Sequence, residues 1–292
     1  ECFFFIADLH SITAPQKPDI LRENIIAAAV DYLALGLDPK KCGIFIQSRV
    51  KEHTELAWIL GTITPLGDLE RMTQFKEKSE RRKKLVGAGL FNYPILMAAD
   101  ILLYKTEIVP VGQDQLQHIE LARSLAKRFN GIYGETFPLP KPMLPKFGAR
   151  IMSLKDPKKK MSKSEPEGCL FIFDSPDEIR EKIKTAVTDS GKEAVYDPEK
   201  KPAISNLLEI HHLLSGALVK EIEKKYQGKG YGEFKSDLAE IAVKYFSAFQ
   251  EKKKELAENM DFVKKILKDG EERARSIAEQ TMKEVKEKIG LI

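Results

Sequence analysis

The segment Cys2–Ala7 reads Cys-Phe-Phe-Phe-Ile-Ala, a short continuous apolar run that is rich in aromatic residues. Apolar positions at helical spacing follow over residues 20–33, and Gly36 is expected to end that helix. Gly43–Gln47 reads Gly-Ile-Phe-Ile-Gln and is a second apolar run of the same kind. Strands that are apolar on both faces and alternate with amphipathic helices indicate a parallel sheet covered on both sides. The sequence therefore predicts an α/β fold.

Further elements of this kind follow along the chain. We expect helices over His53–Ile63 and Phe91–Tyr104, a third strand over Glu107–Gly112, and a long helix from Gln113 to about Arg128. Gly87–Gly89 lacks the spacing of a phosphate-binding glycine motif and is interpreted as a hinge or turn. The proline-rich segment Phe137–Pro142 is expected to be an extended linker.

Beyond Phe173 the pattern changes, because helices recur with few strand signals. The sequence predicts a Rossmann-like parallel-sheet domain over 1–154, a loop and linker over 155–172, and a helical domain over 173–292. Residues 70–90 are expected to pack with the helical domain. The expected helices of that domain are Pro176–Val187, Ala203–Leu214, Leu218–Tyr226 and Phe234–Leu291.

Composition narrows the class of protein. The 292 residues are 42% hydrophobic and carry a net charge of +4, which is too small to indicate nucleic-acid binding by itself. No apolar run reaches the roughly 20 residues of a membrane span, so no membrane association is expected and the cytoplasm is the default location. Cys2, Cys42 and Cys169 lie far apart without a Cys-x-x-Cys spacing, which indicates neither a disulfide framework nor a metal site.

The segment Lys155–Ser164 contains five lysines, one aspartate and two serines. Asp156-Pro157 opens a turn and Glu165-Pro166 closes it, so the segment is expected to be a mobile loop. Lysine ammonium groups and serine hydroxyls can together surround a polyphosphate. The alternative is a solvated basic run, which is common in lysine-rich stretches. A second basic segment, Glu70–Lys84, holds seven basic and three acidic residues.

Asp100 is an unusual neighbour for the apolar residues around it. Tyr93, Met97 and Asp100 fall at i, i+4 and i+7, on one face of the expected helix. A carboxylate left alone in an apolar site is costly, so Asp100 should have a partner. The alternative is a carboxylate at the helix edge that reaches solvent or a backbone amide.

The end of the third expected strand is a second candidate binding position. Gly112 lies at the carboxyl end of that strand, directly before a helix, and this is where α/β sheets bind ligands. Gln113, Asp114 and Gln115 would lie at that position, although simple capping of the helix is the alternative. His211 and His212 are adjacent on a helix, so they point apart and cannot jointly hold a metal.

Five stretches, in order, give the chain a resemblance to a known family. Lys160–Ser164 reads Lys-Met-Ser-Lys-Ser, the signature loop of class I aminoacyl-tRNA synthetases. Together with the other four stretches it resembles the bacterial-type tryptophanyl-tRNA synthetases of that class, from Cys2 into the C-terminal helices. The other four stretches are Glu70–Ser79, Met97–Tyr104, Val109–Gln115 and Gly148–Ser153.

The resemblance implies a function and a set of site residues. It implies ATP-dependent activation of L-tryptophan, with Mg²⁺, and transfer to tRNA(Trp) by a homodimer whose helical domain binds the anticodon. Asp100 would accept the indole N–H.

The other implied tryptophan-site residues are Met97, Val109, Val111 and His10, which would shape the pocket, and Tyr93 and Gln115, near the α-amino group. The implied ATP-site residues are Gly112, Gln113, Asp114 and Ile151 at the adenosine, and Lys160, Met161, Ser162, Lys163 and Ser164 at the triphosphate. Lys78, Lys160 and Lys163 would be catalytic.

One family motif is absent. The His-x-Gly-His-like motif of class I would precede Glu1, so the sequence is expected to lack about thirty upstream residues, or to be a fragment that does not activate tryptophan. Two rival functions stay open: a tyrosine-specific relative with the same fold and lysine loop, and a catalytically inactive paralogue that binds RNA or another partner.

Overall fold

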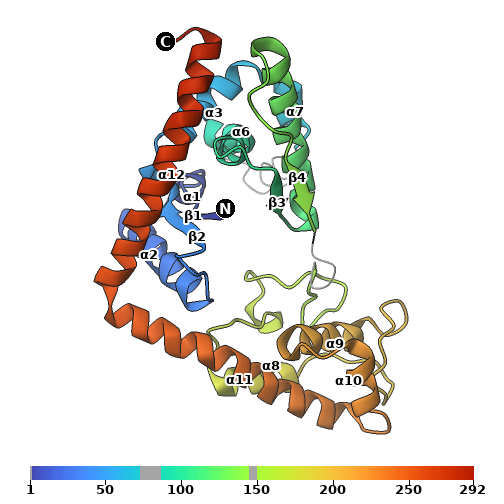
Figure 1. The fold of residues 1–292 in the computed structure, drawn as a ribbon. Helices are drawn as coiled ribbons and strands as arrows, with labels where there is room; N and C mark the ends of the chain where they lie inside the picture. The colour runs from blue at the N-terminus through green and yellow to red at the C-terminus, as the bar shows by residue number, and fades with distance from the viewer. Residues whose placement is uncertain (1, 73–86, 145–149) are drawn as a thin grey trace. The chain divides into compact units, whose positions relative to one another are not determined.

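The computed structural model describes residues 2–72, 87–144 and 150–292, which form two compact units (Figure 1). The first unit combines Glu1–Leu144 with Leu256–Ile292, and the second is Pro145–Glu255. The second unit thus begins at Pro145 rather than after the predicted boundaries at 154 and 172, and the last helix of the chain belongs to the first unit. The α/β class with parallel strands and a helical C-terminal part is confirmed.

The first unit is built around parallel strands β1 (Cys2–Ile6) and β2 (Cys42–Ile46), with Phe4 opposite Ile44. Helix α2 (Pro18–Ala34) connects them, as a parallel pair requires. The helix ends at Leu35, and Gly36 follows with φ +94°, a conformation that glycine adopts without steric cost. The two apolar runs therefore form neighbouring strands as predicted.

Helices α3 (Glu52–Thr62), α6 (Ala88–Leu102) and α7 (Leu116–Tyr133) pack with the strands around one apolar core. Two predictions in this region are wrong. Gly87 is the N-cap of α6 and the next two residues lie in its first turn, so Gly87–Gly89 is no hinge. Helix α7 begins three residues later than expected, after a 3₁₀ turn over Gln113–Gln115. The short helix α4 (Leu66–Glu70) completes this layer.

A second parallel pair joins β3 (Ile108–Pro110) to β4 (Lys141–Met143), with Val109 opposite Pro142. Part of the predicted linker is therefore strand. Proline fits there because it lacks only an N–H donor, and a strand with one partner leaves one row of donors unused.

Helix α12 (Met260–Ile289) packs along β2 and α3 (Figure 1). Gly270 faces the backbone of β2, and a Cβ at this position would overlap the Ile44 carbonyl oxygen. The glycine lets the helix lie directly on the strand, so Val263, Ile266 and Leu267 are buried beside Ile44.

Gly270→Ala is expected to destabilise the first unit by at least about 1–3 kcal/mol, because the added methyl meets backbone atoms that cannot turn aside. Urea unfolding of the variant measures the loss. Gly131→Ala is the matched control, since Gly131 also lies in a helix but has open space around its Cβ position. That control should be neutral or more stable by up to about 1 kcal/mol, and equal effects of the two substitutions would contradict the proposed close contact.

The second unit is a helical assembly of α8 (Pro176–Lys184), α9 (Pro202–Ser215), α10 (Val219–Lys225) and most of α11 (Tyr231–Glu258). Its core contains the fully buried Tyr226 and Phe234. The single helix predicted from Phe234 to Leu291 is two helices, because the Asn259 side chain accepts the Phe262 N–H at 3.3 Å and starts α12. Among the described helices, none combines the length and the apolar character needed to cross a bilayer.

Candidate functional site

The site in the first unit begins where β1 and β2 end. Helix α1 (Asp8–Ser11) follows β1, and the 3₁₀ turn Gln47–Arg49 follows β2. The buried Asp8 carboxylate ties the two strand ends together, since its Oδ1 accepts the backbone N–H groups of Leu9 and Ser48, each at 3.0 Å. This link holds His10 and Gln47 at the same edge of the sheet.

Asp100, near the end of α6, faces these residues and is 6% exposed. Its Oδ1 accepts the Gln47 side-chain amide at 2.7 Å and lies 2.6 Å from His53 Nδ1. Its Oδ2 lies 2.8 Å from His10 Nε2. Because a carboxylate can only accept, all three neighbours donate to it. The prediction that Asp100 is buried in an apolar helix face and has partners is confirmed.

The charge of this carboxylate is fixed by two opposing effects. Burial would raise the pKa of Asp100, but the hydrogen bonds from His10 and His53 outweigh it and hold the pKa below the usual value. Burial, with the nearby Asp100 and Glu52 charges, raises the pKa of the Tyr104 hydroxyl. Asp100 is therefore ionised at neutral pH, whereas the Tyr104 hydroxyl keeps its proton.

Of the other predicted tryptophan-site residues, the structure places His10 against Asp100 and Tyr93 against His10. The Tyr93 ring packs edge-on to the His10 ring at 6.3 Å, and its hydroxyl lies 2.9 Å from His118 Nε2. Burial raises the pKa of Tyr93 to about 12. Three apolar members of the set are partly buried against the core of the first unit, and these are Met97, Val109 and Val111.

The 3₁₀ turn after Gly112 carries the remaining candidates of this unit. Gln113 and Asp114 are exposed, and Gln115 donates its side-chain amide to Asp114 Oδ2 at 3.0 Å. A Cβ at Gly112 would lie 2.7 Å from Asp114 Oδ1, so the glycine leaves room for that carboxylate. The N-cap of α7 is Gln115, and its side chain makes no capping hydrogen bond, although capping was the alternative interpretation.

Sequence reasoning missed three residues that hold Asp100 or its partner. They are Gln47, His53 and Tyr104, whose hydroxyl lies 2.8 Å from His53 Nε2. A signal existed for two of them. Gln47 directly follows an apolar parallel strand and His53 lies in the first turn of the next helix, at the edge of the sheet where ligands bind.

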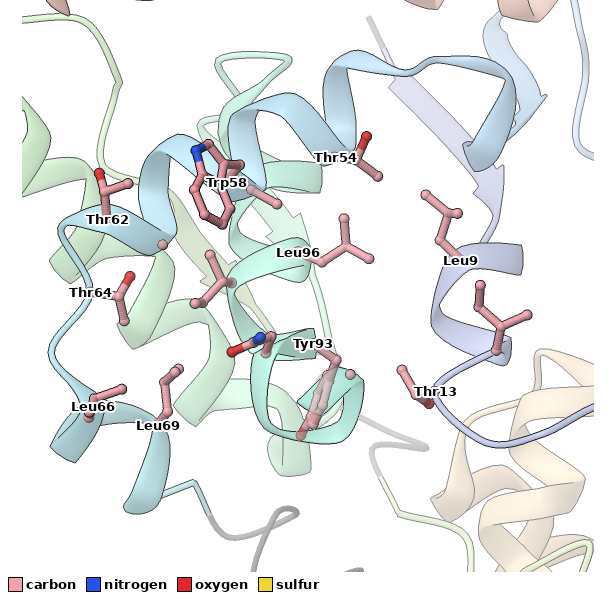
Figure 2. Close-up of a pocket in the computed structure, with 16 residues that line it drawn as sticks. Leu9, Thr13, Thr54, Trp58, Thr62, Thr64, Leu66, Leu69, Tyr93 and Leu96 are labelled. Carbon is pink, nitrogen blue, oxygen red and sulfur yellow. The ribbon is translucent and has the colours of Figure 1, made fainter. Parts of the chain in front are cut away.

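A cavity of about 610 Å³ lies on the same unit between α1, α3, α4 and α6 (Figure 2). Trp58, Leu66 and Leu96 give it a mostly apolar lining, and Tyr93 contributes from α6. Of the predicted tryptophan-site residues, Tyr93 lines it, whereas Asp100, Met97, Val109, Val111, Gln115 and His10 do not. The cavity therefore adjoins the predicted substrate position at Tyr93.

The signature loop belongs to the second unit and has a fixed base. The N–H of Met161 donates to Ile151 at 2.9 Å, and the N–H of Ser153 donates to Lys159 at 2.8 Å, so Met152 and Lys160 form an antiparallel bridge. The predicted ATP residues Ile151, Lys160 and Met161 are thus brought together, while Ser162, Lys163 and Ser164 are exposed beyond the bridge. Lys78 lies outside the described residues.

The side chain of Asn206, from α9, hydrogen-bonds both backbone groups of Met152, which the bridge to Lys160 leaves unused. Its side-chain oxygen accepts the Met152 N–H at 2.8 Å, and its amide donates to the Met152 carbonyl at 2.9 Å. Asn206 is 5% exposed, so it completes the hydrogen bonding of Met152 as a neighbouring strand would. Nothing in the sequence around α9 indicated this role.

If the loop holds ATP, as the resemblance implies, Asn206→Ala is expected to raise the KM for ATP severalfold and to leave the KM for tryptophan unchanged. The substitution leaves two backbone groups of Met152 without partners, at a cost of about 1–3 kcal/mol each, and frees the base of the loop. Steady-state kinetics with each substrate varied in turn measures both constants. Asn130→Ala is the control, because Asn130 makes the same two-way clamp on Phe137 in the first unit. An equal rise in the ATP KM for both variants would contradict the assignment.

Among residues 2–72, 87–144 and 150–292, no three His, Cys, Asp or Glu side chains are grouped closely enough to hold a metal ion. The first unit holds a buried carboxylate with three donors, which suits a ring N–H. The second unit holds a lysine loop on a hydrogen-bonded base, which suits a polyphosphate.

Comparison with known proteins agrees with this chemistry. Residues 1–247 match the family described as tRNA synthetases class I (W and Y). The chain is 54% identical to the tryptophan–tRNA ligase of Caldanaerobacter subterraneus subsp. tengcongensis, covering 100% of this chain and 89% of that protein. It is also similar to two solved tryptophanyl-tRNA synthetases. That of Mycoplasma pneumoniae has a TM-score of 0.91 at 35% identity and covers 98% of this chain and 87% of that one. The enzyme of Campylobacter jejuni, solved with ADP and tryptophan, has a TM-score of 0.80 at 41% identity, and the match covers 98% of this chain and 88% of that one. The chain belongs to the class I tRNA synthetases (W and Y), among the bacterial tryptophan–tRNA ligases that its sequence motifs predicted.

Proposed function

We propose that this protein is an ATP-dependent ligase that activates L-tryptophan to tryptophanyl-adenylate and transfers it to tRNA(Trp). The observation that carries the proposal is the Asp100 carboxylate, which is buried, ionised and placed on an apolar helix face. An apolar pocket separates similar side chains by only about 10- to 200-fold, whereas a buried acceptor that the wrong ligand leaves unpaired rejects that ligand far more strongly. Asp100 is such an acceptor for an indole N–H.

The remaining assignments follow the family resemblance. Met97, Val109, Val111 and His10 shape the tryptophan pocket, and Tyr93 and Gln115 lie near the α-amino group. Gly112, Gln113, Asp114 and Ile151 hold the adenosine, and the loop from Lys160 to Ser164 holds the triphosphate together with Lys78. The neighbouring positions of His10, Tyr93 and Asp100 and the fixed base of the loop support these assignments.

The proposed reaction needs no nucleophile from the protein. A carboxylate oxygen of tryptophan attacks the α-phosphorus of ATP, the bond from that phosphorus to the β-phosphate oxygen breaks, and pyrophosphate leaves. A terminal ribose hydroxyl of the tRNA then attacks the adenylate carbonyl carbon and AMP leaves. The ammonium groups of Lys78, Lys160 and Lys163 would stabilise charge on the transferring phosphate. Mg²⁺ would reach a site of this kind chiefly on the nucleotide phosphates.

The experiment that tests the function is ATP–pyrophosphate exchange by the full-length protein with tryptophan or tyrosine as the only amino acid. Exchange that depends on tryptophan supports the proposal. Exchange with tyrosine alone would show the tyrosine-specific relative, and no affinity for ATP would show the inactive paralogue.

We further propose that the protein is a homodimer and that its helical unit binds the tRNA anticodon. The apolar cavity beside α3 supports the first statement, because Trp58 is 77% exposed and Leu66 is 67% exposed at its edge. The cytoplasmic location expected from the sequence stays a prediction.

Trp58→Asp is expected to weaken the dimer at least about tenfold while leaving the fold of the monomer intact, since an exposed tryptophan is a typical interface anchor. Sedimentation equilibrium measures the dissociation constant. Ile132→Asp is the control, because Ile132 is 55% exposed on the same unit but does not line the cavity. Unchanged association of the Trp58 variant would place the interface elsewhere.

A further inference from the structure

The two oxygens of the Asp100 carboxylate are used unequally. Oδ1 receives hydrogen bonds from Gln47 at 2.7 Å and from His53 at 2.6 Å, whereas Oδ2 receives one from His10 at 2.8 Å. A carboxylate oxygen accepts about two hydrogen bonds. Oδ1 is therefore saturated by protein donors, and Oδ2 has one acceptor position left.

His53 connects this carboxylate to a second polar group. The side chain is fully buried, with Nδ1 on Asp100 and Nε2 at 2.8 Å from the Tyr104 hydroxyl. Because the ionised Asp100 can only accept, a ring proton lies on His53 Nδ1 and points at the carboxylate. In the neutral ring Nε2 is then an acceptor, and the Tyr104 hydroxyl can donate to it and so favour this tautomer.

We propose that His53 and Tyr104 are positioning residues that set the specificity of the tryptophan site by aiming Asp100. The pair holds Oδ1 away from the ligand, so that only the open position of Oδ2 is offered to a ring N–H. A carboxylate free to rotate would present either oxygen, and its lone pairs would not be fixed along one direction. This inference rests on the proposed function, because it takes Asp100 to be the acceptor of the substrate N–H.

A purely structural role for His53 is the alternative. Its ring packs against Phe5 at 5.5 Å and Tyr104 at 5.5 Å, so losing it could simply loosen the core. The two roles predict different results. Loosening the core impairs every ligand of the pocket equally, whereas a misdirected carboxylate impairs only ligands that carry an N–H.

The test compares tryptophan with 3-benzothienylalanine, in which sulfur replaces the indole N–H, by pyrophosphate exchange in the full-length protein. His53→Phe keeps a ring of similar size and removes both nitrogen atoms. It should lower kcat/KM for tryptophan about 10- to 100-fold and change that for the sulfur analogue by less than about threefold. His53→Asn, which puts an amide donor near the position of Nδ1, should restore part of the loss. Tyr104→Phe should lower the tryptophan value about three- to tenfold, because the buried Nε2 of His53 loses its partner and the ring is held less firmly.

Two controls keep the result interpretable. His211→Phe makes the same substitution at a buried histidine of the second unit, where the ring stacks on Phe234 at 6.0 Å, and should leave the ratio of the two kcat/KM values unchanged. Thermal unfolding shows which variants fold. If His53→Phe does not fold, the ratio of the two kcat/KM values is compared in Tyr104→Phe and His53→Asn instead. An equal fall for both ligands in the folded variants overturns the inference alone. No tryptophan-dependent exchange by the unmodified protein overturns the proposed function and the inference with it.

Discussion

Asp100→Asn should reduce kcat/KM for tryptophan about 100- to 1000-fold and abolish the preference for tryptophan over its sulfur analogue. The asparagine keeps the shape of the side chain but replaces one acceptor oxygen with an NH₂ group, although two donors face Oδ1 and one faces Oδ2. One donor would then oppose another in a buried site, and the acceptor for the indole N–H would be lost. Pyrophosphate exchange with both amino acids measures the effect.

Asp174→Asn is the matched control for this prediction. Asp174 is also a buried carboxylate, but it lies in the second unit and pairs with Lys182 at 2.6 Å. Its substitution should lower thermal stability without changing the choice of amino acid. A normal tryptophan KM and an intact preference in the Asp100 variant would remove Asp100 from the recognition of tryptophan.

The need for a partner at Asp100 could be predicted from the sequence, but the partners could not. The cost of burying a lone carboxylate follows from its apolar neighbours on one helix. Its donors, however, come from 90, 53 and 47 residues away along the chain. Only the parallel pairing of β1 and β2 brings His10 and Gln47 to one edge, and the local pattern of neither residue states which carboxylate it will meet.

The path of the C-terminal helices shows the same limit. The apolar spacing beyond Phe234 predicts helix throughout, and the helices are present. The break at Asn259 depends on one side-chain cap, without the proline or glycine that usually signals a helix end. The return of α12 to the first unit depends on close packing at Gly270, and a glycine inside a helical pattern signals such packing only once the opposing strand is known.

The lysine loop was the feature most easily predicted from the sequence, because local charge and a short motif are enough to indicate a phosphate site. The hydrogen-bonded base of the loop could not be predicted from the sequence, because the Met152–Lys160 bridge depends on Asn206 from a distant helix. Local chemistry thus predicted which groups to expect at a phosphate ligand, while the contacts that support the loop required the structure.

Lys163→Ala is expected to lower kcat for pyrophosphate exchange about 100- to 1000-fold with little change in the KM for tryptophan. In the proposed reaction this ammonium stabilises negative charge on the transferring and leaving phosphates, and removal of one such group costs that much in comparable sites. Lys163 is exposed and has no ion-pair partner among the described residues, so its loss should not change thermal stability. Exchange rates at saturating ATP and tryptophan measure the effect.

Lys158→Ala separates a specific role from the general charge of the loop. Lys158 is an exposed lysine of the same segment, and its backbone N–H, which the substitution retains, donates to Asp156 Oδ1 at 3.0 Å and preserves the turn. Both variants remove one positive charge within six residues of each other. If the loop acts only as a basic surface, the two rates will fall equally and the effect will shrink in high salt. If Lys163 contacts the phosphates directly, only its variant will lose activity, and the loss will persist at high ionic strength.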